Sequence, residues 1–154
     1  MKIQLLTIGK QQDTSTKDAV EDFTKRINFY FPCEWKLLPP SKATDPALIK
    51  KNEAQAVLQY IQKEDYLVLL DERGKNISSP DLANLVQLRA NESRKQLVFL
   101  IGGAFGVDPS IMERSNFTWS LSKLVFPHQI VRLVLAEQVY RACTILRNEK
   151  YHHP

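Results

Sequence analysis

Apolar residues along this chain follow two alternating patterns, which predict strands and helices in turn. Short continuous apolar runs are typical of strands buried on both faces of a sheet. Such runs predict strands at 3–8, 34–38, 66–70, 96–101 and 117–120. Apolar spacings of three and four, together with helix-start signals, predict the helices between them. These helices are expected at 14–30, 45–63, 79–91, a short segment from 108, and 128–147.

Three of the expected helices begin with a capping residue followed directly by proline. The pairs are Asp45-Pro46, Ser79-Pro80 and Asp108-Pro109, and proline is favoured at the first helical position. Alternating strands and helices predict an α/β fold with a mostly parallel sheet and helices on both faces. No repeat, linker or low-complexity stretch interrupts the pattern, so residues 1–154 are expected to form one domain.

Composition narrows the class of protein further. The net charge of +4 favours a polyanion partner such as RNA, although basic proteins that bind no nucleic acid are as common. Cys33 and Cys143 lie far apart and lack the paired spacing of metal ligands, which predicts reduced thiols. No apolar run approaches the roughly 20 residues that span a bilayer. We therefore expect a cytoplasmic protein with no membrane segment and no metal.

Parallel sheets bind ligands beyond the carboxyl ends of their strands, at the point where the topology switches. That rule directs attention to three loops, which follow Leu70, Ile101 and Ser120. Residues 100–106 read Leu-Ile-Gly-Gly-Ala-Phe-Gly, and glycine lets a ligand approach the main chain closely. The spacing fits neither a dinucleotide fingerprint nor a Walker A loop. This segment is therefore either a ligand loop of another kind or a tight turn without a ligand.

The stretch from Ser120 to His128 is polar, then apolar, and ends in Pro-His. Its backbone groups could hold an adenine and a ribose, and His128 could orient a substrate or move a proton. The alternative is a connection that fills the core and leaves His128 on the surface.

The last helix is apolar on more than one face, which calls for cover on more than one side. In a domain this small, a second copy is a plausible source of that cover, so a homodimer through the C-terminal helix is expected. Arg132 is a candidate contact for RNA or the partner, whereas Glu137 and Arg141 are spaced to pair along the helix. The basic and aromatic tail, 150–154, is suited to base stacking and phosphate contact, or is a fraying end. His152 and His153 without a third ligand are a weak metal signal.

Taken together, these motifs resemble the small SPOUT, or α/β-knot, methyltransferases of bacterial large-subunit ribosomal RNA. The resemblance spans the chain and is strongest after Gln96. It depends on Leu-Ile-Gly-Gly-x-x-Gly at 100–106, Trp-Ser-Leu-Ser at 119–122, Phe-Pro-His at 126–128, Val-Arg-Leu-Val-Leu-Ala-Glu-Gln-Val-Tyr-Arg-Ala at 131–142, and Tyr-His at 151–152.

The resemblance implies transfer of a methyl group from S-adenosylmethionine to N3 of a pseudouridine in 23S ribosomal RNA, on the ribosome. It also implies a C-terminal trefoil knot, which general folding rules would argue against. The implied catalytic residues are His128, Arg132, Tyr151 and His152, and the tail pair is able to serve the partner's site. The implied cofactor-binding residues are Leu70, Asp71, Gly102, Gly103, Lys123, Leu124, Val125, Phe126, Pro127 and His128.

Phe105 and His153 depart from the family pattern, in which a small or acidic residue and a basic residue are usual. Two other functions stay open at this point. One is a nucleotide-binding α/β enzyme that uses Gly102 and Gly103 to hold phosphate. The other is a non-enzymatic dimer that binds RNA or the ribosome on the same scaffold.

Overall fold

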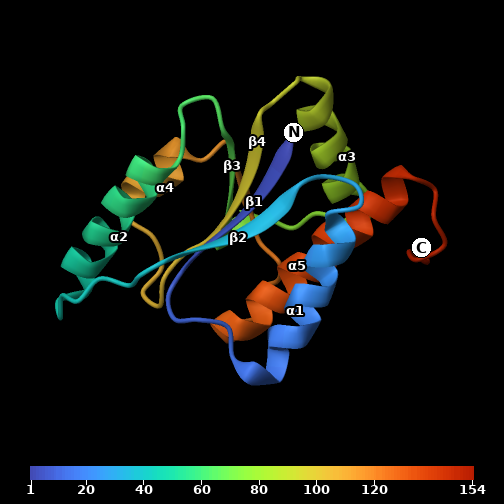
Figure 1. Cartoon of the computed structure of the whole chain (residues 1–154). Helices are drawn as coiled ribbons and strands as arrows, with labels where there is room; N and C mark the ends of the chain where they lie inside the picture. The colour runs from blue at the N-terminus through green and yellow to red at the C-terminus, as the bar shows by residue number, and fades with distance from the viewer.

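One five-stranded parallel sheet forms the centre of the molecule, with the strand order β2-β1-β4-β3-β5 (Figure 1). The computed structural model describes residues 1–154. Every strand pairing is parallel, which confirms the predicted α/β class. The strands are β1 (Lys2–Ile8), β2 (Cys33–Leu38), β3 (Tyr66–Lys75), β4 (Gln96–Ile101) and β5 (Phe117–Trp119).

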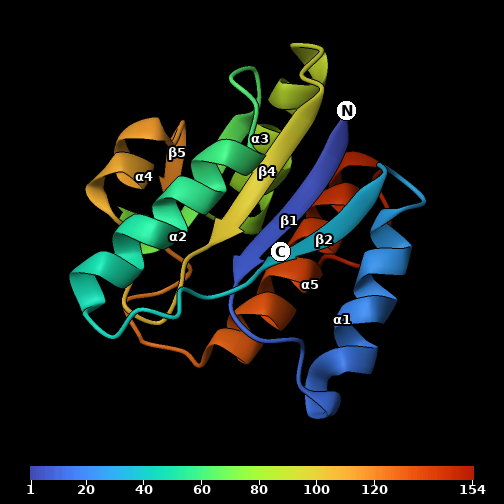
Figure 2. The same cartoon turned by 60° about the vertical axis from the view of Figure 1, so that its left-hand side comes forward.

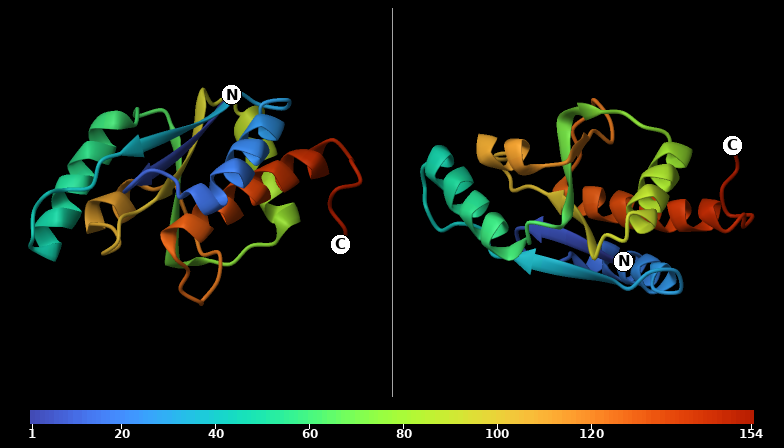
Figure 3. Two further views of the ribbon diagram at one scale, coloured as in Figure 1. Left: turned by 60° about the horizontal axis from the view of Figure 1, so that its bottom comes forward. Right: turned by 90° about the horizontal axis from the view of Figure 1, so that it is seen from above.

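Helices cover both faces of the sheet, as predicted. The helices are α1 (Thr14–Ile27), α2 (Pro46–Tyr60), α3 (Ser79–Asn91), α4 (Pro109–Arg114) and α5 (His128–Leu146). Helices α2 and α4 lie on one face, and α1, α3 and α5 lie on the other (Figures 2 and 3). Two buried clusters fill the spaces between the sheet and these two layers. Cys33 and Cys143 are free thiols within the first cluster.

The continuous apolar runs follow from this burial on both faces, because successive strand side chains point to opposite sides. In β4, Leu97 and Phe99 face the α1, α3 and α5 layer, whereas Val98 and Leu100 face α2 and α4. A strand in this position has no face left for polar residues.

The helix starts follow local capping chemistry. The Asp45 carboxylate accepts a hydrogen bond from Leu48 N at 3.1 Å, and Asp108 accepts one from Ser110 N at 3.0 Å. The cap of α3 is Ser78, one residue before the predicted start, and it forms a capping box with Asp81. Helix α1 ends earlier than predicted, at Ile27. The side chain of Asn28, the next residue, donates to Cys33 O and accepts from Cys33 N, and so fixes the turn into β2.

Strand β3 is longer than predicted, running five residues past Leu70 to Lys75, and its end lies across β5. Gly74 lies so close to the backbone of Thr118 and Trp119 that any side chain there would overlap it. Ser120 N donates to Lys75 O at 2.9 Å, and the Asn76 amide donates to Ser120 O at 2.8 Å. These contacts join two segments that are far apart in the sequence.

The chain leaves adjacent strands β3 and β4 toward opposite faces of the sheet. Helix α3 follows β3 and packs in one cluster, and α4 follows β4 and packs in the other. Such a divergence opens a crevice at the carboxyl ends of the two strands, where parallel sheets bind ligands. None of the helices has the length and apolar character that crossing a membrane requires.

Candidate functional site

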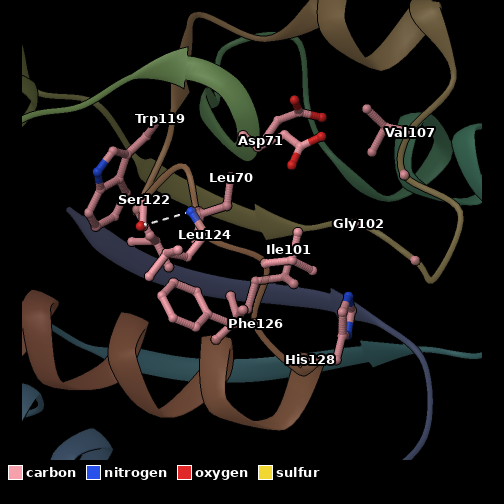
Figure 4. Close-up of a pocket in the computed structure, with 16 residues that line it drawn as sticks. Leu70, Asp71, Ile101, Gly102, Val107, Trp119, Ser122, Leu124, Phe126 and His128 are labelled. Carbon is pink, nitrogen blue, oxygen red and sulfur yellow. Dashed lines mark hydrogen bonds between the residues drawn. The ribbon is translucent and has the colours of Figure 1, made fainter.

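A cavity of about 230 Å³ occupies the crevice at the carboxyl ends of β3, β4 and β5 (Figure 4). All three loops selected by the strand-end rule contribute to its wall. Most of the predicted cofactor-binding residues line it: Leu70, Asp71, Gly102, Gly103, Leu124, Val125, Phe126 and His128. Their contact with a cofactor stays a prediction.

The glycine loop forms one wall of the cavity, and the atoms behind it leave no room for side chains at Gly102 or Gly103. A side chain at Gly102 would lie 2.6 Å from the Val107 methyl group, and one at Gly103 would overlap the Glu53 carboxylate. Gly106 has a φ of +83°, in the region that favours glycine, and its N donates to Gly103 O at 3.1 Å. The loop is therefore packed tightly from behind, and its bare backbone faces the cavity.

The loop between β5 and α5 forms the opposite wall. Ser122 holds its shape, since its hydroxyl accepts a hydrogen bond from Leu124 N at 3.0 Å (Figure 4). Lys123 and Pro127, which were also predicted to bind cofactor, are not among the lining residues. Lys123 is exposed to solvent, and Pro127 serves as the residue before α5, where its carbonyl accepts from Ile130 N and Val131 N.

His128 is the first residue of α5, and its ring lines the cavity. Burial lowers the pKa of His128, and the positive charge of Arg132 acts in the same direction. A hydrogen bond with the backbone of Gly102 opposes this shift, since it raises the pKa of His128. A lowered pKa leaves the ring neutral near pH 7, so it can accept a proton. His128 is thus not the surface residue that the alternative interpretation required.

The charged residues that line the cavity are acidic. Asp71 accepts three hydrogen bonds from Arg73, at 2.8 to 2.9 Å, and these hold the pKa of its carboxyl below the usual range. Glu72 lines the cavity beside it, and no lysine or arginine does. Because Arg73 offsets the charge of Asp71, Glu72 is the lining carboxylate that has no ion-pair partner.

Arg132 lies in a different environment from the one expected. It is 3% exposed, and its Nη2 donates to Lys10 O at 2.8 Å. It does not line the cavity. In a single chain this side chain is too buried for the predicted contact with RNA, because the α5 and 9–10 segments close around it.

The tail folds back on its own helix. The Tyr151 hydroxyl donates to Glu137 at 3.0 Å, and Arg141 stacks over the Tyr151 ring and contacts His152 Nδ1 at 3.3 Å. Glu137 and Arg141 do pair along the helix, as predicted, but they also hold the tail. At about 1.5 Å per residue, Arg141 lies roughly 20 Å from His128 along the helix axis. Because His152 contacts Arg141, His152 and His128 are not brought together within one chain.

Several lining residues were not predicted. Ile101 and Trp119 end β4 and β5, so the strand-end rule could have included them. Val107 lines the cavity because it packs against Gly102. Phe105, which departs from the family pattern, is 55% exposed and does not line the cavity. No cluster of three or more potential metal-ligating side chains occurs in the structure.

Comparisons with known proteins show which family this chain belongs to. Residues 1–152 match the model of a family described as predicted SPOUT methyltransferase. A protein named ribosomal RNA large subunit methyltransferase H from Cytophaga hutchinsonii is 41% identical over 155 residues, which cover 99% of this chain and all of that protein. The protein of the same name from Christiangramia forsetii is 39% identical, with 99% of each chain covered.

A solved structure shares the fold at much lower identity. The probable methylase family protein from Haemophilus influenzae superposes with a TM-score of 0.55 and 11% identity. The match covers 99% of this chain and 70% of that protein.

Proposed function

This chain belongs to the SPOUT methyltransferase family, and from that premise we propose that it methylates N3 of a pseudouridine in 23S ribosomal RNA. The proposed methyl donor is S-adenosylmethionine, and the proposed substrate is the RNA within the ribosome. Relatives at 39% to 41% identity over nearly their whole length carry the name of a ribosomal RNA methyltransferase, which supports the RNA substrate.

The observation that carries the proposal is the cavity, where bare glycine backbone, apolar side chains and carboxylates meet. S-adenosylmethionine has a flat base, ribose hydroxyls and a cationic sulfonium. The apolar walls suit the base, the backbone of Gly102 and Gly103 suits close polar contacts, and the unpaired Glu72 carboxylate suits the positive charge. The same carboxylate is unfavourable for the phosphates of a nucleotide, which argues against a nucleotide-binding enzyme.

When bound, the donor supplies an electrophilic methyl group, so the residues of the protein act mainly by positioning. The N3 proton of the pseudouridine has to leave as the new bond forms. His128 is the proposed base in this chain, because it lines the cavity and its lowered pKa keeps the ring neutral. Tyr151 and His152 are proposed to act from a partner's tail, since their own helix holds them far from their own cavity.

A homodimer through α5 fits the exposed apolar surface. Leu124 and Val125, in the loop before α5, are 70% and 85% exposed, and Ile130, in the first turn of α5, is 39% exposed. Exposed apolar clusters of this kind mark interaction sites. Two copies of α5 packed antiparallel about a two-fold axis would place each tail beside the cavity of the other chain.

We also propose that the end of the chain is knotted, as in the family. The support is the contact of β3 with β5 beyond Leu70, where Gly74 and Lys75 lie against 118–120. This contact between β3 and β5 would close a loop, and the segment that leads into α5 would pass through that loop.

The test is to incubate the protein with labelled S-adenosylmethionine and intact ribosomes, free large subunits or naked 23S RNA. Methyl incorporation into N3 of a pseudouridine, located by digestion and mass spectrometry, is the expected result. Binding to ribosomes without incorporation would favour the non-enzymatic RNA-binding dimer. Stabilisation against heat by ATP or NAD, and not by S-adenosylmethionine, would favour the nucleotide-binding enzyme.

A further inference from the structure

Glu53 is a buried carboxylate with no cationic partner. It lies in the middle of α2 and is 7% exposed. None of the six ion pairs of the structure includes it. Burial raises the pKa of Glu53, because the ionised form is poorly solvated there, and a hydrogen bond from the Ser41 backbone acts in the opposite direction. An unpaired buried charge destabilises a fold, so its presence calls for a physical reason.

Its position offers that reason. The Glu53 carboxylate fills the space that a side chain on Gly103 would occupy. Gly103 lines the cavity with its backbone, so the backbone of one glycine separates the carboxylate from the ligand space. Asp71 lies at the cavity edge near Val107, where Arg73 offsets its charge (Figure 4). Glu72 also lines the cavity and has no ion-pair partner, so it adds a second negative group at this space.

We propose that Glu53 is a specificity-determining residue, whose negative charge makes the cavity prefer the cationic methyl donor over the neutral product of transfer. The inference rests on the proposed function and deepens it. Glu53 does not contact the ligand in this proposal; it acts by its electric field across Gly103. The bound cation then supplies the countercharge that the carboxylate lacks in the protein alone.

The chemistry of transfer gives this preference a direction. The methyl–sulfur bond of the sulfonium breaks, its electron pair stays on sulfur, and the methyl group joins the nucleophilic nitrogen, which loses its proton. The sulfur ligand therefore changes from a cation to a neutral thioether, S-adenosylhomocysteine. Attraction from Glu53 acts on the donor and vanishes with the product, which favours exchange of product for fresh donor.

Other titratable groups share this region. Lys50 on the same helix and Asp108, the cap of α4, line a small space with Glu53 behind the glycine loop. On the cavity side are Asp71, Glu72 and His128. Only a variant that changes Glu53 alone can separate its effect from that of these neighbours.

The test measures the binding of S-adenosylmethionine and S-adenosylhomocysteine by calorimetry to the intact protein and to Glu53→Gln. The variant keeps the size of the side chain and removes its charge. We expect the ratio of donor affinity to product affinity to fall by about tenfold, through weaker donor binding with product binding unchanged. Glu64→Gln, an exposed carboxylate just before the start of β3, is the matched control and should leave the ratio unchanged.

Equal weakening of both ligands in Glu53→Gln would overturn the inference, because a purely structural role weakens both. The same holds if the unaltered protein binds both ligands equally. If the unaltered protein binds neither ligand, the proposed function itself fails, which is a separate outcome.

A second variant, Glu53→Asp, keeps the charge and shortens the side chain by one methylene group. It should retain most of the donor preference. Loss of the preference in Glu53→Asp to the same extent as in Glu53→Gln would contradict the inference, because the charge would then not be its source.

Discussion

The Tyr151 hydroxyl donates a hydrogen bond to the Glu137 carboxylate at 3.0 Å, and this bond ties the C-terminal tail to the middle of its own helix. Arg141 adds a stacking contact from the next turn. The tail is thus held against the helix that precedes it.

Replacing Tyr151 by phenylalanine should loosen the tail. The lost hydrogen bond to a carboxylate is expected to reduce the free energy of unfolding by about 1 kcal/mol. Amide exchange of residues 150–153 should become faster, measured by hydrogen–deuterium exchange with mass spectrometry. Tyr60→Phe, which loses a bond to Gln4 on the opposite face of the sheet, is the control. Unchanged exchange in the tail of Tyr151→Phe would show that the bond does not order it.

Gly74→Ala should destabilise the whole domain. The added methyl group would overlap the backbone of Thr118 and Trp119, which cannot move aside as a flexible side chain can. We expect a loss of about 2 kcal/mol, measured by urea denaturation. The neighbouring Lys75→Ala changes an exposed side chain and should cost far less. Equal stability of the two variants would mean that β3 and β5 separate easily.

His128→Gln should change how stability depends on pH. Because burial lowers the pKa of His128 in the folded state, the unfolded chain binds a proton more readily. The folded protein should therefore lose stability as pH falls below about 6.5, the ordinary histidine value. The variant should lack this part of the loss. Denaturation from pH 7.5 down to pH 5 tests it, and parallel curves for both proteins would refute the assignment.

Ile130→Glu should prevent dimer formation if α5 forms the interface. Ile130 is 39% exposed and does not line the cavity, so donor binding should persist. Sedimentation velocity should show a monomer, and methyl transfer should be lost because the partner's tail is absent. Leu58→Glu, on α2 with 38% exposure, is the matched control. A dimer that survives Ile130→Glu places the interface elsewhere.

Much of the fold could be predicted because its signals are local. Asp45-Pro46 and Asp108-Pro109 mark helix starts, and the apolar run at Gln96–Ile101 marks a strand buried on both faces. The extension of β3 could not be predicted in this way. It depends on the fit of Gly74 against Thr118, a contact between distant segments that no local sequence pattern predicts.

The site shows the same division. Leu70, Asp71 and Gly102 follow from the strand-end rule, because parallel strands finish at one edge. Lys123 was expected in the cavity by its position in a motif, yet its side chain is exposed to solvent. Glu53 was not predicted at all, since a charged residue in the middle of a helix is usually solvated, and only the packing of α2 on the glycine loop buries it.

The short strand β5 has a consequence for the order in which the protein becomes active. Strand β5 pairs with β3 alone, and the loop and helix after it supply Leu121, Phe126 and His128 to the cavity. A newly made chain therefore has no complete cavity until its last third has been synthesised and docked. If the cavity is the proposed donor site, the methyl donor can bind only after β5 and α5 have docked on the sheet. Donor binding would then distinguish completely folded chains from incomplete ones.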